Sequence, residues 1–311
     1  MTKVIFMGTP EIGKYVLQSL LDLQDVQVIA VVCQPDRLMN RKKEIIYQPV
    51  KQLALEHNIP VLQPNKVKEI TEEIAQLQPD VIVTCAFGQF INKEILAIPT
   101  YGCFNVHASL LPKLRGGAPI HWAIINGETE SGMTLMKMVS KMDAGDIISQ
   151  MKCPISARET TASLYDKLKQ LGYDIIQRDF HLLLQQDIPS VAQYEALVTF
   201  GYNITKEQEI VDFNNEAHVV DQWIRGLFSK PMANFNYQGE LIKIHAAEMT
   251  SIPSKVAPGE ISQITKEAIY IATKNFDIAL TKIQLPNKKP LLIKELLNGN
   301  NVFTEWYRNH K

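Results

Sequence analysis

Two segments dominated by apolar residues, Val26 to Cys33 and Asp80 to Ala86, place the strongest constraint on how this chain can fold. A strand that is buried on both faces has this pattern, because helices cover a parallel sheet from both sides. Segments 49–57 and 67–77 carry helical patterns, and Lys3 to Met7 is another short apolar run. Strands that alternate with helices predict an open, mainly parallel α/β sheet.

The first strand-to-helix turn argues against a nicotinamide or flavin dinucleotide as a ligand. Thr9 follows the apolar run and is the expected N-cap of a helix, with Pro10 at the first helical position. Such dinucleotides bind at a G-x-G-x-x-G sequence, and only Gly8 and Gly13 occur here. The sheet is therefore expected to be Rossmann-like, but a dehydrogenase of the Rossmann type is disfavoured.

The pattern changes in the last third of the chain, where short strands are separated by turns. A helix is predicted over Ala217 to Leu227, where apolar residues recur at helical spacing. Candidate strands follow at 242–246, 268–273 and 278–285, with glycine and proline turns between them. Strands at this spacing predict a small β-barrel, of the OB-like kind.

These patterns divide the chain into two domains. A long amphipathic helix is predicted over Thr161 to Gln185 and closes a first domain over residues 1–187. Residues 188–204 lack periodicity and are expected to run across the surface as a linker. Thr205 and Gln208 then have the spacing of a capping box at the start of the barrel domain, over residues 205–311.

The charge of the chain disfavours a protein that attracts nucleic acid over its whole surface. The sequence has 32 Lys and Arg residues and 33 Asp and Glu residues, a net charge of -1. Contact with RNA would then need a local basic patch. One candidate patch is Lys282, Lys288, Lys289 and Lys294, for which scattered surface lysines remain the alternative.

The cysteines and the N-terminus indicate a protein of the cytoplasm. Cys33, Cys85, Cys103 and Cys153 lie in apolar, strand-like runs without the paired spacing of metal ligands. We expect reduced, buried thiols and no metal site. The N-terminal apolar run is too short for a signal peptide, and no segment approaches the ~20 apolar residues that span a membrane.

Three polar residues form a candidate catalytic group. If Tyr101 to Val106 is a strand, Asn105 and His107 point to the same face, because successive side chains alternate. The Ser-Leu-Leu-Pro that follows cannot continue the strand, so His107 lies near a strand end. Asp143 comes later, at another strand-to-turn junction.

An amide, an imidazole and a carboxylate together suit the attack of an amine on a carbonyl. Asn105 can donate a hydrogen bond to the tetrahedral oxyanion. A histidine side chain titrates near pH ~6.5 and can give or take a proton around neutrality. Asp143 could orient His107 or pass a proton through water. The alternative, a satisfied structural histidine and a turn-forming aspartate, remains open from the residues alone.

The wider sequence around these residues resembles the folate-dependent formyltransferases. The resemblance rests on Asn-Val-His-Ala-Ser-Leu-Leu-Pro, Arg-Gly-Gly-Ala-Pro-Ile and Met-Asp-Ala-Gly-Asp, and it is strongest from Gly8 to Leu171. It implies that Asn105, His107 and Asp143 are the catalytic residues. It also implies that a loop lines the tetrahydrofolate site, and this loop consists of Ser109, Leu110, Leu111 and Pro112.

The resemblance also assigns roles to two loops at the carboxyl ends of predicted strands. The segment 34–44 is basic and without periodicity, and in the family a basic insertion here reaches the acceptor end of tRNA. The best match in this chain is Arg41, Lys42 and Lys43, for which a solvated surface loop is the alternative. The family uses the loop at 87–90 to surround the pterin ring, whereas a plain strand-end turn is the other interpretation.

Taken together, the resemblance implies transfer of a formyl group from 10-formyltetrahydrofolate to the α-amine of methionyl initiator tRNA. We expect the protein to be a monomer. Two alternatives stay open. The acceptor could be another amine, on glycinamide ribonucleotide or a nucleotide-linked amino sugar, and the basic loop at Arg41 discriminates against these. A non-catalytic RNA-binding protein is the alternative from another class, and it would bind no folate.

Overall fold

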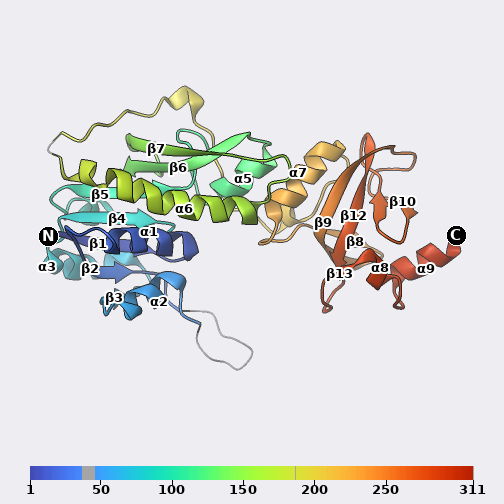
Figure 1. Ribbon diagram of the computed structural model, residues 1–311, viewed down its shortest axis with the longest axis horizontal. Coiled ribbons are helices and arrows are strands. Elements are labelled where there is room, and N and C mark those ends of the chain that lie inside the picture. The colour runs from blue at the N-terminus through green and yellow to red at the C-terminus, as the bar shows by residue number, and fades with distance from the viewer. Residues whose placement is uncertain (37–45, 186, 311) are drawn as a thin grey trace. The chain divides into compact units, whose positions relative to one another are not determined.

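The computed structural model describes residues 1–36, 46–185 and 187–310 of the chain (Figure 1). The chain forms two compact units, each built from more than one stretch of sequence. The first unit contains Met1–Ile120, Thr129–Ile155 and Leu164–Tyr202. The second contains His121–Glu128, Ser156–Ser163 and Asn203–Lys311, so it includes two short segments that precede Leu164 of the first unit.

A seven-stranded sheet forms the centre of the first unit, and its strand order is β3-β2-β1-β4-β5-β6-β7. The first five strands in this order are parallel, whereas β6 and β7 are antiparallel to their neighbours. This arrangement confirms the predicted Rossmann-like, mainly parallel sheet. The strands are β1 (Thr2–Gly8), β2 (Val26–Val32), β3 (Val61–Leu62), β4 (Val81–Cys85), β5 (Gly102–His107), β6 (Glu130–Lys137) and β7 (Ile147–Pro154).

Helices cover the sheet because the central strands are apolar on both faces. All five residues of β4 are buried, as are the last five of β1. The α-helices up to Asp179 are α1 (Glu11–Leu21), α2 (Pro49–Glu56), α3 (Thr71–Leu77), α4 (Lys93–Leu96), α5 (Pro119–Ile125) and α6 (Thr161–Asp179). Helices α1 and α6 lie side by side (Figure 1), joined by hydrogen bonds such as that from Ser19 Oγ to the Tyr173 carbonyl, 2.7 Å.

Several helix ends differ from the sequence-based predictions. Thr9 does not cap α1, because its hydroxyl donates to the Phe87 carbonyl and accepts from the Gln34 N–H instead. The hydrogen bond to Phe87, in the loop after β4, thus takes the place of the expected capping hydrogen bond at the start of α1. Helix α6 ends at Asp179, and a 3-10 helix over Phe180–Leu184 follows it. A further 3-10 helix, Val67–Ile70, precedes α3.

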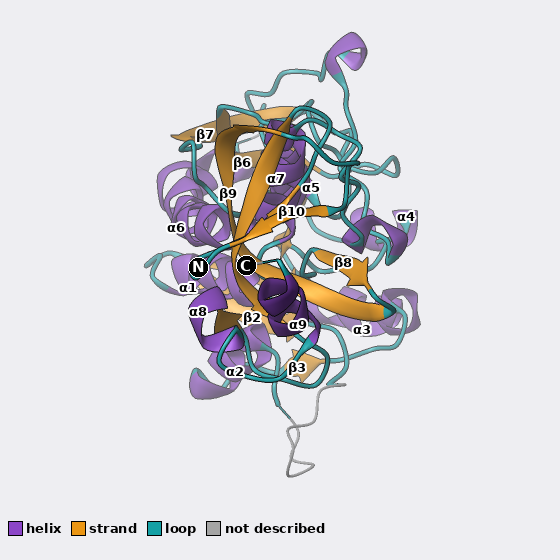
Figure 2. Ribbon diagram, turned by 90° about the vertical axis from the view of Figure 1, so that its right-hand side faces the viewer, coloured by secondary structure: helices purple, strands orange, loops and turns teal. Residues whose placement is uncertain are grey.

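The second unit is built on an antiparallel sheet with the order β10-β11-β12-β9-β8, and β13 pairs with β12. The strands are β8 (Asn234–Tyr237), β9 (Glu240–Pro253), β10 (Ile261–Ile264), β11 (Ile269–Ile271), β12 (Phe276–Gln284) and β13 (Leu291–Leu292). The register between β9 and β12 shifts at three places, and such bulges bend and twist a strand pair. The sheet is accordingly curled (Figure 2), which confirms the predicted OB-like class of fold.

Helices complete the second unit. Helix α7 (Ala217–Leu227) has the predicted bounds, and α8 (Ile293–Leu296) and α9 (Val302–Asn309) follow the strands. The apolar side of α7 is buried in the same core as Ile125 of α5. Gly226 of α7 lies directly against Ile125, so a side chain at residue 226 would collide with it. The ring of Trp122 packs edge-on against Trp223, with centroids 6.0 Å apart.

The expected buried, reduced cysteines are found with one exception. Cys33, Cys85 and Cys103 are buried free thiols, whereas Cys153 on the outermost strand is half-exposed. Burial raises the pKa of Cys85 to about 12. These thiols therefore belong to the core of the fold.

Candidate active site

Strand β5 carries two of the three candidate residues on one face. It pairs with β4 on one side and β6 on the other, so the strand is held from both edges. Asn105 and His107 are two residues apart, which places their side chains on the same side of the sheet. Asn105 is half-buried, and His107 is 7% exposed.

A neighbouring threonine fixes the orientation of the Asn105 amide. The Thr84 hydroxyl on β4 donates to Asn105 Oδ1 at 2.9 Å. The amide nitrogen therefore points the other way, where it donates to Asp143 Oδ1 at the long distance of 3.5 Å. This orientation directs an N–H donor into the site.

A backbone carbonyl sets the protonation pattern of the His107 ring. Nε2 lies 3.1 Å from the Leu114 carbonyl oxygen, which can only accept, so Nε2 carries a proton. The other nitrogen, Nδ1, faces Asp143 Oδ2 at 3.8 Å. Nδ1 is consequently the ring nitrogen that faces the carboxylate of Asp143.

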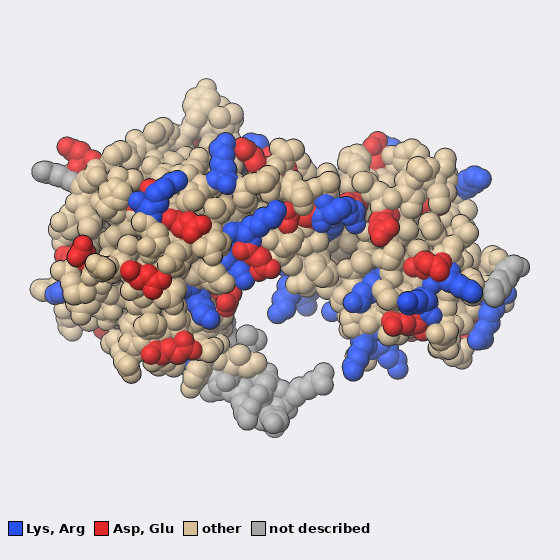
Figure 3. Space-filling view, viewed as in Figure 1, with Lys and Arg blue, Asp and Glu red and all other residues tan. Residues whose placement is uncertain are grey.

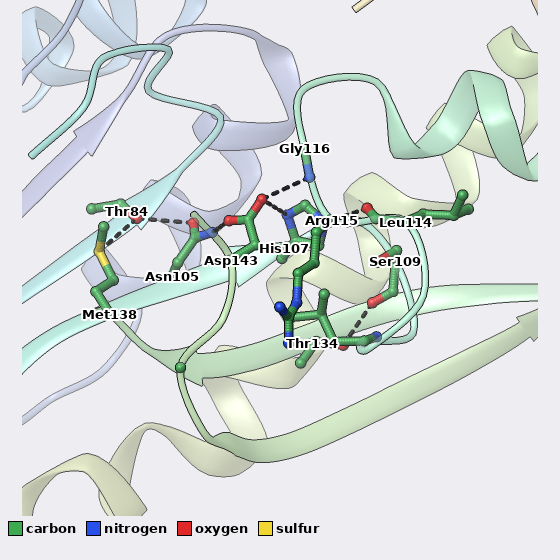
Figure 4. Close-up of polar contacts among 12 residues, drawn as sticks. Thr84, Asn105, His107, Ser109, Leu114, Arg115, Gly116, Thr134, Met138 and Asp143 are labelled. Atoms are coloured by element: carbon green, nitrogen blue, oxygen red, sulfur yellow. Dashed lines mark hydrogen bonds and ion pairs between the residues drawn. The ribbon is translucent and has the colours of Figure 1, made fainter. Parts of the chain in front are cut away.

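Asp143 completes the group from the loop after β6 (Figure 4). Its carboxylate lies between the amide of Asn105 and the ring of His107, and Oδ2 accepts the Gly116 N–H at 2.9 Å. Asp143 has a φ of 49°, in the left-handed region that L side chains rarely adopt. The carboxylate has one short hydrogen bond and two long contacts, so it retains acceptor capacity for another group.

The loop at 109–112 is fixed by side chains of the antiparallel strands. The Thr134 hydroxyl of β6 donates to the Ser109 carbonyl at 2.6 Å and accepts the Leu111 N–H at 3.2 Å. Gln150 of β7 donates to the Leu111 carbonyl at 2.9 Å. Ser109 and Leu111 are buried, while Leu110 and Pro112 are half-exposed. The loop thus offers a ligand a rigid, mainly apolar wall.

The loop after β4 leaves the same edge of the sheet, because β4 and β5 are parallel neighbours. Of its two aromatic residues, Phe87 is buried and Phe90 is 69% exposed. The Phe87 carbonyl accepts from Thr9 and from Gln34, so the loop is held in place. An exposed aromatic ring at this edge of the sheet suits a flat heteroaromatic ligand.

Sequence reasoning missed Thr84, Gly116 and the Leu114 carbonyl as parts of the site. Thr84 had a signal that could have revealed it, since it is the single polar residue in the apolar strand β4. The contacts of Gly116 and Leu114 have no such signal, because backbone groups of any residue can make them.

Of the seven basic residues predicted to contact RNA, four lie in the part of the chain that the structure describes. Arg41, Lys42 and Lys43 lie outside the described residues. In the second unit Lys288, Lys289 and Lys294 are exposed, and Lys282 is half-buried. Basic side chains gather in the lower part of this unit as drawn in Figure 3, while acidic and basic side chains alternate over the first unit.

Within residues 1–36, 46–185 and 187–310, no three His, Cys, Asp or Glu side chains are grouped so as to hold a metal ion. None of the helices in these ranges is long and apolar enough to cross a membrane.

Comparison with known proteins defines the class. The chain matches the formyl transferase family over residues 2–179 and the formyl transferase C-terminal domain over residues 203–301. The protein belongs to the formyl transferase family.

Relatives within the family are named methionyl-tRNA formyltransferase. One from Ureaplasma urealyticum is 49% identical over 301 residues, which cover 97% of this chain and 98% of the relative. Another, from Bacillus mycoides, is 45% identical and covers 96% of each chain. Among solved structures, an N-formyltransferase from Helicobacter canadensis in complex with folinic acid and dTDP-3-aminofucose has a TM-score of 0.67, at 20% identity. It covers 90% of this chain and 99% of its own, and at this identity the likeness shows the shared fold.

Proposed function

We propose that this protein transfers a formyl group from 10-formyltetrahydrofolate to the α-amine of methionyl initiator tRNA, for the start of translation. The names of relatives that are 43–49% identical along nearly the whole chain support this acceptor. The observation that carries the chemistry is the meeting of Asn105, His107 and Asp143 around one point, from positions up to 38 residues apart in sequence.

In the proposed reaction the three side chains act on different atoms. The α-amine attacks the formyl carbon, a C–N bond forms, and the bond from that carbon to the folate nitrogen breaks. The Asn105 N–H and a protonated His107 Nδ1 donate to the oxyanion of the tetrahedral stage. Asp143 receives the proton that the amine loses, and this proton is then passed to the leaving nitrogen.

The folate supplies the formyl carbon, and the loops around the site fit its flat ring. Leu110 and Pro112 are half-exposed apolar residues, and Phe90 presents an exposed ring in the loop after the neighbouring strand. We propose the loop of Ser109, Leu110, Leu111 and Pro112 as part of the folate site. Its rigidity helps to hold the formyl carbon in position beside Asn105.

The tRNA is proposed to contact Arg41, Lys42 and Lys43, together with lysines of the second unit. Each phosphate contact releases counterions, so binding should weaken as salt rises. Alanine at Arg41 and at Lys42 should raise the KM for tRNA, while the KM for the folate stays unchanged. A raised KM for both substrates would contradict this assignment.

An acceptor assay tests the proposed function directly. The purified protein is incubated with 10-formyltetrahydrofolate and, in separate reactions, methionyl initiator tRNA, a nucleotide-linked amino sugar and glycinamide ribonucleotide. We expect formylation of the tRNA alone. Formylation of the amino sugar or the ribonucleotide in its place would replace the proposed acceptor, and a protein that binds no folate and formylates none of the three would be a non-catalytic RNA binder.

A further inference from the structure

The segment Gln193–Gly201, which we term the strap, lies along the candidate active site. Its sequence predicts a surface linker, but residues up to Tyr202 belong to the first unit. Backbone hydrogen bonds join it to the catalytic loop: the Arg115 N–H donates to the Thr199 carbonyl at 2.9 Å, and the Gly201 N–H donates to the Arg115 carbonyl at 2.8 Å. A side chain at Gly116 would collide with the Gly201 carbonyl, so the two segments are in close contact.

The first residue of the strap holds the backbone of Asp143. Gln193 Nε2 donates to the carbonyls of Asp143 and Gly145, at 2.8 and 2.7 Å. Its Oε1 accepts from Arg115 Nε at 2.9 Å, which fixes the orientation of the amide. Arg115 is fully buried, and Glu195 of the strap pairs with its Nη2 at 2.9 Å.

A second strap residue holds the backbone that contacts His107. Thr199 Oγ1 accepts the Leu114 N–H at 2.9 Å. Leu114 has a φ of 59°, so it too is a non-glycine residue in the left-handed region. Its carbonyl is the group that accepts from His107 Nε2. Asp143 and Leu114, two non-glycine residues of the site in the left-handed region, are therefore each joined to the strap by a side-chain hydrogen bond.

We propose that Gln193 and Thr199 are positioning residues for the transfer reaction. Gln193 keeps Asp143 in the left-handed conformation that directs its carboxylate between Asn105 and His107. Thr199 keeps Leu114 in the conformation that directs its carbonyl at Nε2, which leaves Nδ1 as the nitrogen that faces the site. Without these bonds both residues relax toward ordinary backbone conformations, and the group loses its alignment. The inference rests on the proposed function, which supplies the reaction to be measured.

Kinetics of single variants give the first test. Gln193→Met and Thr199→Val keep the size of each side chain and remove the hydrogen bonds. We expect kcat to fall by about tenfold or more, while the KM for folate and for tRNA stays within about twofold, because misalignment affects the reacting atoms and leaves substrate contacts in place. Thr199→Ser retains the hydroxyl and should keep most of the activity. The matched control is Leu197→Ala, at a strap residue whose side chain is 59% exposed.

A double variant separates positioning from a general structural role. If Gln193 acts through Asp143, Gln193→Met should cost little further activity in an Asp143→Ala background. Full additivity of the two losses would overturn the assignment for Gln193. Similar losses in Leu197→Ala would also overturn it, because they would show that any change in the strap is harmful.

The ring of His107 offers a readout that needs no activity. Nitrogen NMR of the full chain should show His107 in the tautomer with the proton on Nε2, and Thr199→Val should populate the other tautomer. An unchanged tautomer in that variant would overturn the role of Thr199. An inactive wild-type protein would count against the proposed function alone, whereas an active wild-type protein with unchanged kcat in both variants would count against this inference alone.

Discussion

Two carboxylates, one in each unit, are held in different ways. Asp221 in the second unit receives Arg158 Nη1 at 2.7 Å and Arg225 Nε at 2.6 Å, so its charge is neutralised by short bonds. Asp143 in the first unit has one short bond, from a backbone N–H, and contacts of 3.5 and 3.8 Å to its side-chain partners. A carboxylate with saturated bonds stabilises a fold, whereas one with long contacts remains available to a substrate.

The largest effect is expected on activity, in the first unit. Asn105→Ala removes a preorganised donor to the oxyanion, and one such donor lowers the barrier by about 3 to 4 kcal/mol. We expect kcat to fall by at least about a hundredfold in the formylation assay, with an unchanged midpoint of thermal unfolding. Near-normal turnover would show that the amide of Asn105 has no role in the transition state. The contrast between a catalytic group in the first unit and a structural carboxylate in the second would then have no support.

The next effect is expected on stability, in the second unit. Asp221→Ala leaves Arg158 and Arg225 without their shared partner, and breaking a buried pair costs about 3 kcal/mol at the low end of the usual range. We choose the low end because Arg158 is 52% exposed and can be rehydrated. Urea unfolding should show the loss, and the kcat of the folded protein should be retained. The control is Glu248→Ala, at an exposed residue of β9.

A smaller loss is expected at Asp277, another buried carboxylate of this unit. Asp277 is 3% exposed and accepts hydrogen bonds from the hydroxyls of Ser254 and Ser262. Asp277→Ala should lower the free energy of unfolding by about 2 kcal/mol, since two hydroxyls lose their acceptor. If this variant lost more activity than stability, Asp277 would belong with Asp143, and the comparison would fail.

The smallest effect is expected on the pH dependence of stability, and it arises from His121. Nε2 of His121, like that of His107, lies against a backbone carbonyl, that of Lys230 at 2.8 Å. Burial lowers the pKa of His121 below its ordinary value of 6.5, and the Lys230 carbonyl opposes this shift. The unfolded chain then takes up the proton first as the pH falls, so stability that is present above pH 6.5 is lost as the pH falls toward the lowered pKa.

Urea unfolding of the second unit at a series of pH values measures this effect. The wild-type midpoint should decline below pH 6.5, and His121→Gln should remove that part of the decline. An equal decline in the variant would assign the pH dependence to other groups.

Elements with strong local patterns were predictable. Strand β2 and helix α7 lie within one residue of their predicted bounds, because apolar runs and stripes mark where burial begins and ends. Asn105 and His107 share a face for the same kind of reason, since the two-residue period of a strand decides it. The expectation that these residues act in catalysis stays a prediction.

Features that depend on distant contacts were not predictable. Leu114 adopts a left-handed conformation that leucine disfavours, and Asp143 adopts one that aspartate tolerates better. Hydrogen bonds from another segment contact the backbone of both residues. The strap has no periodicity because its contacts are made by backbone groups and by single polar side chains. Local patterns also contain no sign that residues 121–128 and 156–163 pack in the second unit.

The composition of the second unit affects how it can be made and cut. A fragment that begins at Asn203 lacks Ile125 and Trp122, which complete its core and face Trp223. A single protease cut after Tyr202 therefore cannot release this unit whole. During synthesis, residues 121–128 and 156–163 leave the ribosome before α7 has been made. Their apolar side chains therefore stay exposed until the later part of the second unit folds around them.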